Sequence, residues 1–250
     1  TIKFIKDKKW NSALKSASKV KDREFRNLIT WMYLKTTRNG ASFSEYKNFI
    51  EQSNNYPRIN RIRFLAESKI YLRNNSPTSI INWFDKYPPL GGMGKIKLAE
   101  AYLEKGQVDK VEELIKEGWE TATISKNDLG YYRAKFKKFI DSEDHIKRAD
   151  YLAWEKKYWD LKRMLKYLPK DQRALYNARQ ILMSNSYGVD NAISKVPEYL
   201  KKDPGLEFDR LRWRNRRGRL EGSLEILYRN SIKTEEQMVR PDKWLSLIHI

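Results

Sequence analysis

The densest group of side chains able to do chemistry is a run of six arginines within ten residues. They are Arg210, Arg212, Arg214, Arg216, Arg217 and Arg219. Guanidinium groups bind carboxylates and phosphates through paired hydrogen bonds, so anion binding is one interpretation of this run. Because helical residues are about 100° apart, six arginines cover most of a helix circumference and several must share a face. A solvated, partly ion-paired helix face is the simpler interpretation, and we favour it over a peptidoglycan or other polyanion site.

A second group places Asp141, Glu143, Asp144 and His145 close together, as a metal site would require. The same residues also fit a helix start, with Ser142 as N-cap and acidic side chains in the first turn, where the helix dipole favours negative charge. We favour the helix start, so no metal site is expected here.

Two further patterns lack the context that catalysis needs. Glu67 lies in an amphipathic helix beside Phe64 and Leu65, which predicts a surface glutamate rather than a general acid. The segment from Gly91 to Gly94 follows two prolines and lacks the Lys-Ser/Thr of a phosphate loop, which predicts a loop at a helix start. With no Cys and 2 His in the chain, we expect no catalytic residue, metal or cofactor.

The elements that carry these residues are predicted to be helices almost throughout. Apolar side chains recur at three- and four-residue steps between residues 96 and 115, on both sides of Gly106. Glycine tolerates the left-handed conformation that ends many helices, so Gly106 predicts a turn between two helices. Ser42 and Glu45 have the spacing of a capping box. No alternation persists long enough to predict a strand.

The hairpin pattern around Gly106 recurs along the chain. Aligning it with the segments around Lys156 and Gly218 keeps apolar residues at the core positions, apart from a small Ser223, and the segment around Lys8 is a degenerate copy. Such hairpins resemble tetratricopeptide units, although their spacing is irregular. The sequence therefore predicts an all-α fold, an irregular α-solenoid or superhelix of TPR-like helix hairpins.

Composition limits the partners. The chain has 51 Lys and Arg against 32 Asp and Glu, a formal net charge of +19. Nucleic acid, an anionic membrane surface and a carboxylate-rich cell-wall polymer would all be attracted to it, and charge alone does not choose among them. The sequence contains no apolar run of about 18 residues, so no transmembrane segment is expected.

An ordered set of short segments resembles the amino-terminal superhelical domain of soluble lytic murein transglycosylases. The segments are RNLITWMYL (26–34), GASFSE (40–45), YPRINR (56–61), WF (83–84), PPLGGMGK (88–95), SEDH (142–145), GVD (188–190), VP (196–197), DPGLEFDR (203–210) and RPDKW (240–244). The resemblance extends from Lys3 to Trp244, and its specificity lies in the order of the segments.

The resemblance implies a bacterial periplasmic enzyme whose signal peptide is not part of this sequence. That family cleaves the MurNAc-GlcNAc bond of peptidoglycan without water and leaves a 1,6-anhydromuramoyl end. Its catalytic glutamate, in a Glu-Ser motif, belongs to a lysozyme-like domain that follows the superhelix, so Glu67-Ser68 is not carried over. We therefore expect residues 1–244 to be a non-catalytic, U-shaped or ring-type superhelical domain. Its expected partners are peptidoglycan glycan strands and the C-terminal catalytic domain of the same full-length chain.

Residues 245–250 depart from the family pattern. Their sequence, LSLIHI, is the translation of CTGTCTCTTATACACATC, the end of a transposon-type sequencing adapter. We interpret these residues as a non-native tail, which removes His249 from consideration as a functional group.

Two other functions fit a basic helical-repeat protein, namely nucleic-acid binding and protein-protein scaffolding. A repeat code for RNA needs a regular period, and turns at positions 8, 106, 156 and 218 do not supply one. No nucleic acid is therefore expected as a partner. The sequence favours the substrate-retaining helical scaffold of a lytic transglycosylase over both alternatives.

Overall fold

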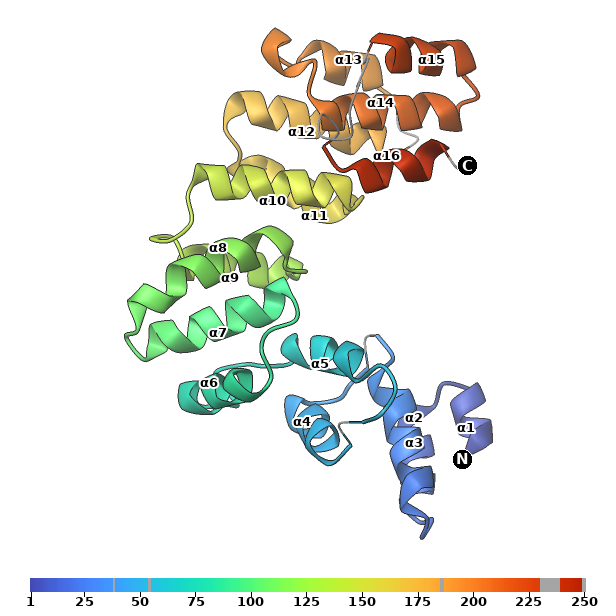
Figure 1. Ribbon diagram of the computed structural model, residues 1–250, viewed down its shortest axis with the longest axis vertical. Helices are drawn as coiled ribbons and strands as arrows, with labels where there is room; N and C mark the ends of the chain where they lie inside the picture. The colour runs from blue at the N-terminus through green and yellow to red at the C-terminus, as the bar shows by residue number, and fades with distance from the viewer. Residues whose placement is uncertain (38, 54, 185–186, 230–238, 249–250) are drawn as a thin grey trace. The chain divides into compact units, whose positions relative to one another are not determined.

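The computed structural model describes residues 1–37, 39–53, 55–184, 187–229 and 239–248 (Figure 1). The fold is all-α, as predicted: 71% of the described residues are helical, and the described ranges contain no strand. None of the helices in these ranges combines the length and apolar character that crossing a bilayer requires. The chain divides into two compact units, Thr1–Gly118 (unit 1) and Trp119–Ile250 (unit 2), and the division falls within a helix.

Unit 1 is built from short amphipathic helices in which chain neighbours pack together. They are α1 (Ile2–Lys6), α2 (Trp10–Ala17), α3 (Arg23–Leu34), α4 (Phe43–Gln52), α5 (Ile59–Glu67), α6 (Pro77–Lys86), α7 (Gly92–Glu104), the 3₁₀ turn η1 (Val108–Lys110) and α8 (Val111–Thr121). Tyr46, Ile50, Ile62 and Ile80 are each at most 1% exposed and form the centre of its main apolar cluster. The predicted capping box at Ser42 is present at the start of α4.

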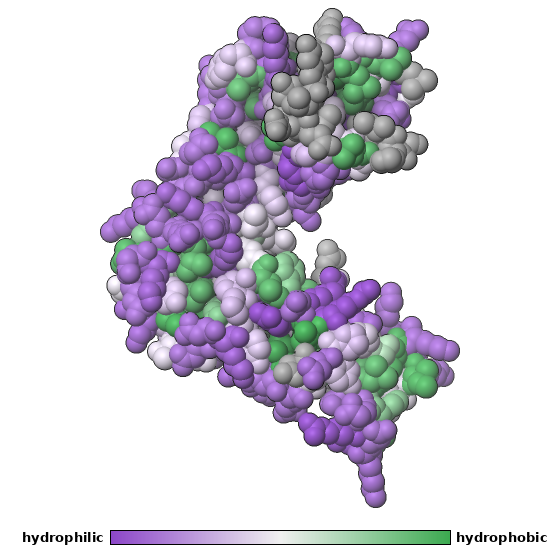
Figure 2. Space-filling model, viewed as in Figure 1, coloured by the Kyte–Doolittle hydropathy of each residue, from purple (hydrophilic) through white to green (hydrophobic). Residues whose placement is uncertain are grey.

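Unit 2 has the same character, with longer helices at its centre. They are α9 (Lys126–Lys135), α10 (Ser142–Trp154), α11 (Tyr158–Met164), η2 (Leu165–Tyr167), α12 (Lys170–Leu182), α13 (Val189–Ser194), η3 (Glu198–Leu200), α14 (Pro204–Arg216), α15 (Leu220–Arg229) and α16 (Pro241–Ile248). Much of the visible surface in Figure 2 is hydrophilic, and apolar residues show as separate patches. This agrees with short helices that each bury a narrow stripe.

Four helix hairpins share one turn geometry. Lys8, Gly106, Lys156 and Gly218 all have left-handed backbones, with φ of 55°, 72°, 57° and 68°. The N–H group after each turn residue bonds to the carbonyl five residues earlier. These bonds join Lys9 to Phe4 (2.8 Å), Gln107 to Tyr102 (3.0 Å), Lys157 to Leu152 (2.9 Å) and Arg219 to Arg214 (3.1 Å).

This bond, with the left-handed residue before it, defines the Schellman helix ending. The four predicted turn positions are therefore confirmed, in the hairpins α1/α2, α7/α8, α10/α11 and α14/α15. The aligned apolar residues are not all buried. Val111 and Leu161 are fully buried, whereas Val108 is 50% exposed.

The helix start predicted near residue 142 is confirmed, but its cap residue was wrong by one. Asp141, not Ser142, is the N-cap of α10, and its side chain accepts the N–H groups of Glu143 (2.8 Å) and Asp144 (3.1 Å). In turn, the Asp144 carboxylate accepts a hydrogen bond from the Asp141 N–H at 3.0 Å, which completes a capping box. Aspartate and serine are equally good caps, so composition alone did not decide between these neighbours.

His145 follows this helix start and belongs to the interior of unit 2. It is 9% exposed, and the Trp119 Nε1–H donates to its Nδ1 at 3.2 Å. Burial, with the positive charge of Arg133, lowers the pKa of His145. A neutral imidazole is needed to accept this hydrogen bond, so His145 serves as a structural acceptor for Trp119.

The boundary predicted at residue 244 falls inside α16. Trp244 is 4% exposed and packs in a cluster with Trp154, Phe208, Leu211 and Ile226, whereas Leu245 is 45% exposed. The helix continues through Ile248. His249 and Ile250, the end of the segment predicted to be a non-native tail, lie outside the described residues.

Candidate anion-binding surface

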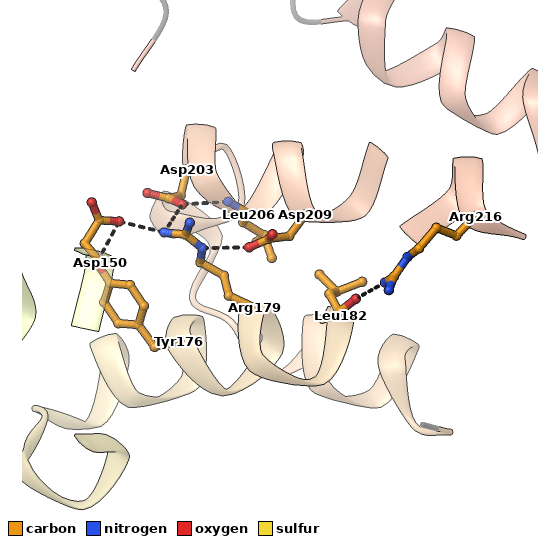
Figure 3. A network of polar contacts seen from close by, with 8 residues as sticks. All are labelled: Asp150, Tyr176, Arg179, Leu182, Asp203, Leu206, Asp209 and Arg216. Carbon is orange, nitrogen blue, oxygen red and sulfur yellow. Dashed lines mark hydrogen bonds and ion pairs between the residues drawn. The ribbon is translucent and has the colours of Figure 1, made fainter. Parts of the chain in front are cut away.

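The helix that carries most of the six arginines is α14, and a buried ionic network fixes its position (Figure 3). Arg179 of α12 is fully buried, and its Nε–H donates to Asp209 Oδ2 at 2.9 Å. Its Nη1–H donates to Asp150 Oδ1 of α10 at 2.6 Å. The N-cap of α14 is Asp203, which accepts the Leu206 N–H at 2.8 Å. Arg179 thus connects α10, α12 and α14 in one network.

Gly205 lets α14 approach this arginine. A Cβ at Gly205 would overlap the Arg179 guanidinium, so only glycine permits this packing. Asp209 is 3% exposed; burial raises its pKa, and the charge of Arg179 opposes that rise. A buried ion pair contributes little net stability but is costly to break, because removing one partner leaves an uncompensated charge. The network therefore holds α14, which carries the arginines, in one position along α12 and α10.

Three arginines of α14 have protein partners. Arg210 pairs with Glu207 at 2.5 Å. Arg214 donates to the Gly222 carbonyl and lies 3.5 Å from Glu225. Arg216 donates to the carbonyls of Leu182 (2.6 Å) and Met183 (3.2 Å) at the end of α12, where the helix dipole favours a cation. For these three, the structure agrees with the partly ion-paired interpretation.

Arg217 and Arg219 lie beyond the last helical residue of α14. Their guanidinium carbons are 5.1 Å and 5.4 Å from the centroid of the Trp213 ring. Both side chains are exposed, which is the usual setting for a weak cation–π contact. The six arginines therefore lie in several separate environments.

Arg212 differs from the other five. Its side chain is half-buried, and its Nη1 is shielded from solvent without a hydrogen-bond partner. Burial lowers its pKa, and the charge of Asp209 opposes that change. Asp209 is already bonded to Arg179. A buried donor without an acceptor is rare in folded proteins and calls for a specific explanation.

Two lysines from distant parts of the sequence lie near Arg212. Lys156 is exposed, and partial desolvation with the charges of Arg212 and Lys243 lowers its pKa, while the charge of Asp209 opposes that change. Lys243 is fixed beside the α10/α11 turn, because its Nζ lies 2.9 Å from Glu155 Oε1. Sequence reasoning singled out Lys156 as a turn residue and did not include either lysine in a site. The available signal was a lysine at a turn position where two of the three other hairpins, at Gly106 and Gly218, carry glycine.

Glu67 was predicted to lie on the surface, and this was wrong. It is 3% exposed at the end of α5, and its carboxylate accepts the N–H groups of Leu90 (2.5 Å) and Gly91 (3.1 Å). Gly91 is the N-cap of α7 and has no side chain to cap it, so Glu67 supplies the acceptor. The predicted helix start is thereby confirmed, but Gly92 and Gly94 belong to the first turn of α7 rather than to a loop. Gly94 allows this approach, since a Cβ there would lie 2.5 Å from Glu67 Cδ.

The burial of Glu67 predicts a pH-dependent stability. Burial raises its pKa from 4.5 to about 7, against the lowering influence of the backbone N–H groups. Because the folded pKa lies above the unfolded value, the Glu67 contribution is complete below pH 4.5 and is lost as the pH rises through about 7. Urea unfolding followed across this interval should show the decline. Glu67→Gln removes the titration, so an unchanged pH profile in that variant would contradict this assignment.

Comparison with protein-family models, with curated proteins and with solved structures gave no match for this chain. The described residues also contain no group of three or more His, Asp or Glu side chains arranged to hold a metal ion.

Proposed function

We propose that this chain is the non-catalytic helical scaffold of a periplasmic peptidoglycan lytic transglycosylase. In this proposal the scaffold retains glycan strands, and a C-terminal lysozyme-like domain of the full-length protein cleaves the MurNAc-GlcNAc bond to give 1,6-anhydromuropeptides. We also propose that the hairpins within each unit stack as an irregular α-solenoid. The observation that carries the proposal is a net charge of +19 displayed on repeated helix hairpins. The ordered resemblance selects peptidoglycan from among the polyanions.

Retention in this proposal is electrostatic and distributed. Stem peptides of peptidoglycan carry carboxylates at repeated positions along the glycan strands. Many weak contacts between these carboxylates and exposed Lys and Arg side chains raise the effective concentration of substrate near the catalytic domain. Such contacts are screened over about 8 Å at physiological ionic strength, so binding should weaken steeply with added salt.

Co-sedimentation tests this proposal directly. The purified chain should sediment with intact sacculi at physiological salt and should do so less with sacculi whose stem-peptide carboxylates have been converted to amides with a carbodiimide and ammonia. It should release no anhydromuropeptides by itself. Stronger binding to RNA than to sacculi would replace the proposal with nucleic-acid binding. Capture of a defined protein, with no sacculus binding, would replace it with a protein-protein scaffold.

A further inference from the structure

An aromatic cluster in unit 2 brings cations from three separate segments together. The ring centroids of Trp154 and Phe208, and of Phe208 and Trp244, are 5.1 Å apart. Arg212 lies one helical turn after Phe208 and so emerges on the same side of α14. Lys156 follows Trp154 by two residues, and Lys243 directly precedes Trp244. The packed rings therefore position the backbone segments from which Lys156, Arg212 and Lys243 extend.

The nearby carboxylates do not balance this positive charge. Glu155 already pairs with Lys243 at 2.9 Å and with Arg240 at 3.3 Å. Asp209 is bonded to Arg179. Lys156 is exposed to solvent and has no ion-pair partner in the described part of the chain, and the buried Nη1 of Arg212 has no acceptor there. Lys156, Arg212 and Lys243 therefore carry an excess of positive charge beside the aromatic cluster, and Arg212 Nη1 is a hydrogen-bond donor without an acceptor.

The backbone of Lys156 adds a second observation. Its φ of 57° lies in the left-handed region, where the equivalent residues Gly106 and Gly218 avoid the cost of a side chain and the equivalent Lys8 bears it. Like charges around Lys156 add to that cost, since they lower its pKa. Lys156 thus combines a left-handed backbone with neighbouring like charges.

We infer that Lys156, Arg212 and Lys243 form a discrete site for one oxyanion, a carboxylate or a phosphate group. An oxyanion supplies acceptors for the Arg212 Nη1–H and for the Lys156 ammonium, and it offsets the repulsion that Arg212 and Lys243 exert on Lys156. Arg216, one turn after Arg212, adds long-range attraction while bonded to the end of α12. The site does not depend on the proposed function. Assigning stem-peptide carboxylates as its natural ligand does rest on that function.

Calorimetric titration of the whole chain with inorganic phosphate and with citrate tests the site. Each anion should bind saturably at low salt, and the preferred one identifies the ligand group. Arg212→Gln should weaken binding about tenfold or more, the effect of losing one charge-assisted hydrogen bond. Arg173→Gln is the matched control, because it removes a guanidinium from an exposed position of α12 in the same unit. It should change the affinity less than about twofold.

Lys156→Gly separates binding from folding. It removes one cation of the site and relieves the left-handed backbone, so affinity should fall while the melting temperature stays level or rises. Absence of saturable binding would overturn the inference, as would equal losses in Arg212→Gln and Arg173→Gln. Sacculus retention without saturable anion binding would overturn only this site. Saturable anion binding without sacculus retention would overturn only the proposed function.

Discussion

Replacing Arg179 with methionine should destabilise unit 2 by about 3–5 kcal/mol, the usual cost of removing one partner of a buried ion pair. The variant leaves Asp209 buried at 3% exposure without its guanidinium, and it removes the bond to Asp150. The rise that burial alone imposes on the pKa of Asp209 would then be unopposed by Arg179. Urea unfolding of the purified chain measures the loss.

A double variant distinguishes broken charge pairing from broken packing. Arg179→Met combined with Asp209→Leu removes both buried charges, and it should be clearly more stable than the sum of the two single losses predicts. Strict additivity would contradict an ion pair as the source of the cost. Asp150 and Asp203 stay in place in all variants, and both are more exposed than Asp209.

Replacing Trp244 with alanine should cost about 3–5 kcal/mol, because it removes a buried indole from the aromatic cluster. Trp244 is 4% exposed and contacts the Phe208 ring edge-on at 5.1 Å. Its Nε1 is buried without a partner, so Trp244→Phe should lose less than alanine does. Thermal and urea unfolding report the difference.

Leu245→Ala is the matched control on the same helix. Leu245 is 45% exposed, and its truncation should change the stability by less than about 0.5 kcal/mol. Equal, small losses for both variants would mean that α16 does not pack on unit 2 through Trp244. A large loss at Leu245 would mean that the predicted non-native segment contributes to the core.

The sequence predicted the helical class and the four turns because both are local properties. Periodicity reports a helix from a few adjacent residues, and a turn residue is recognised by its distance from flanking apolar steps. The alignment located Lys8 and Lys156 at turns although neither is glycine, and both have left-handed backbones. The choice of Ser142 over Asp141 as cap shows the remaining uncertainty of one residue at a helix start.

What the sequence did not predict depends on partners far along the chain. Glu67 looks like a surface residue of α5, and its burial follows from the start of α7, which it caps more than twenty residues later. The individual environments of the α14 arginines depend on carbonyls and carboxylates of other helices, such as Leu182 and Glu225. Lys243 joins Lys156 only because α16 packs beside the α10/α11 turn. No local pattern carries this information.

The four Schellman turns also bear on how the chain reaches its fold. Each is closed by a bond that spans five residues, and each joins helices that are direct neighbours in sequence. Contacts of such short range form quickly, since little chain entropy is lost before they close. The α1/α2 and α7/α8 hairpins should therefore form while later segments are still being synthesised. A hairpin that has already formed buries its apolar stripe against its own partner helix. It is then less available for incorrect pairing with helices from distant parts of the sequence.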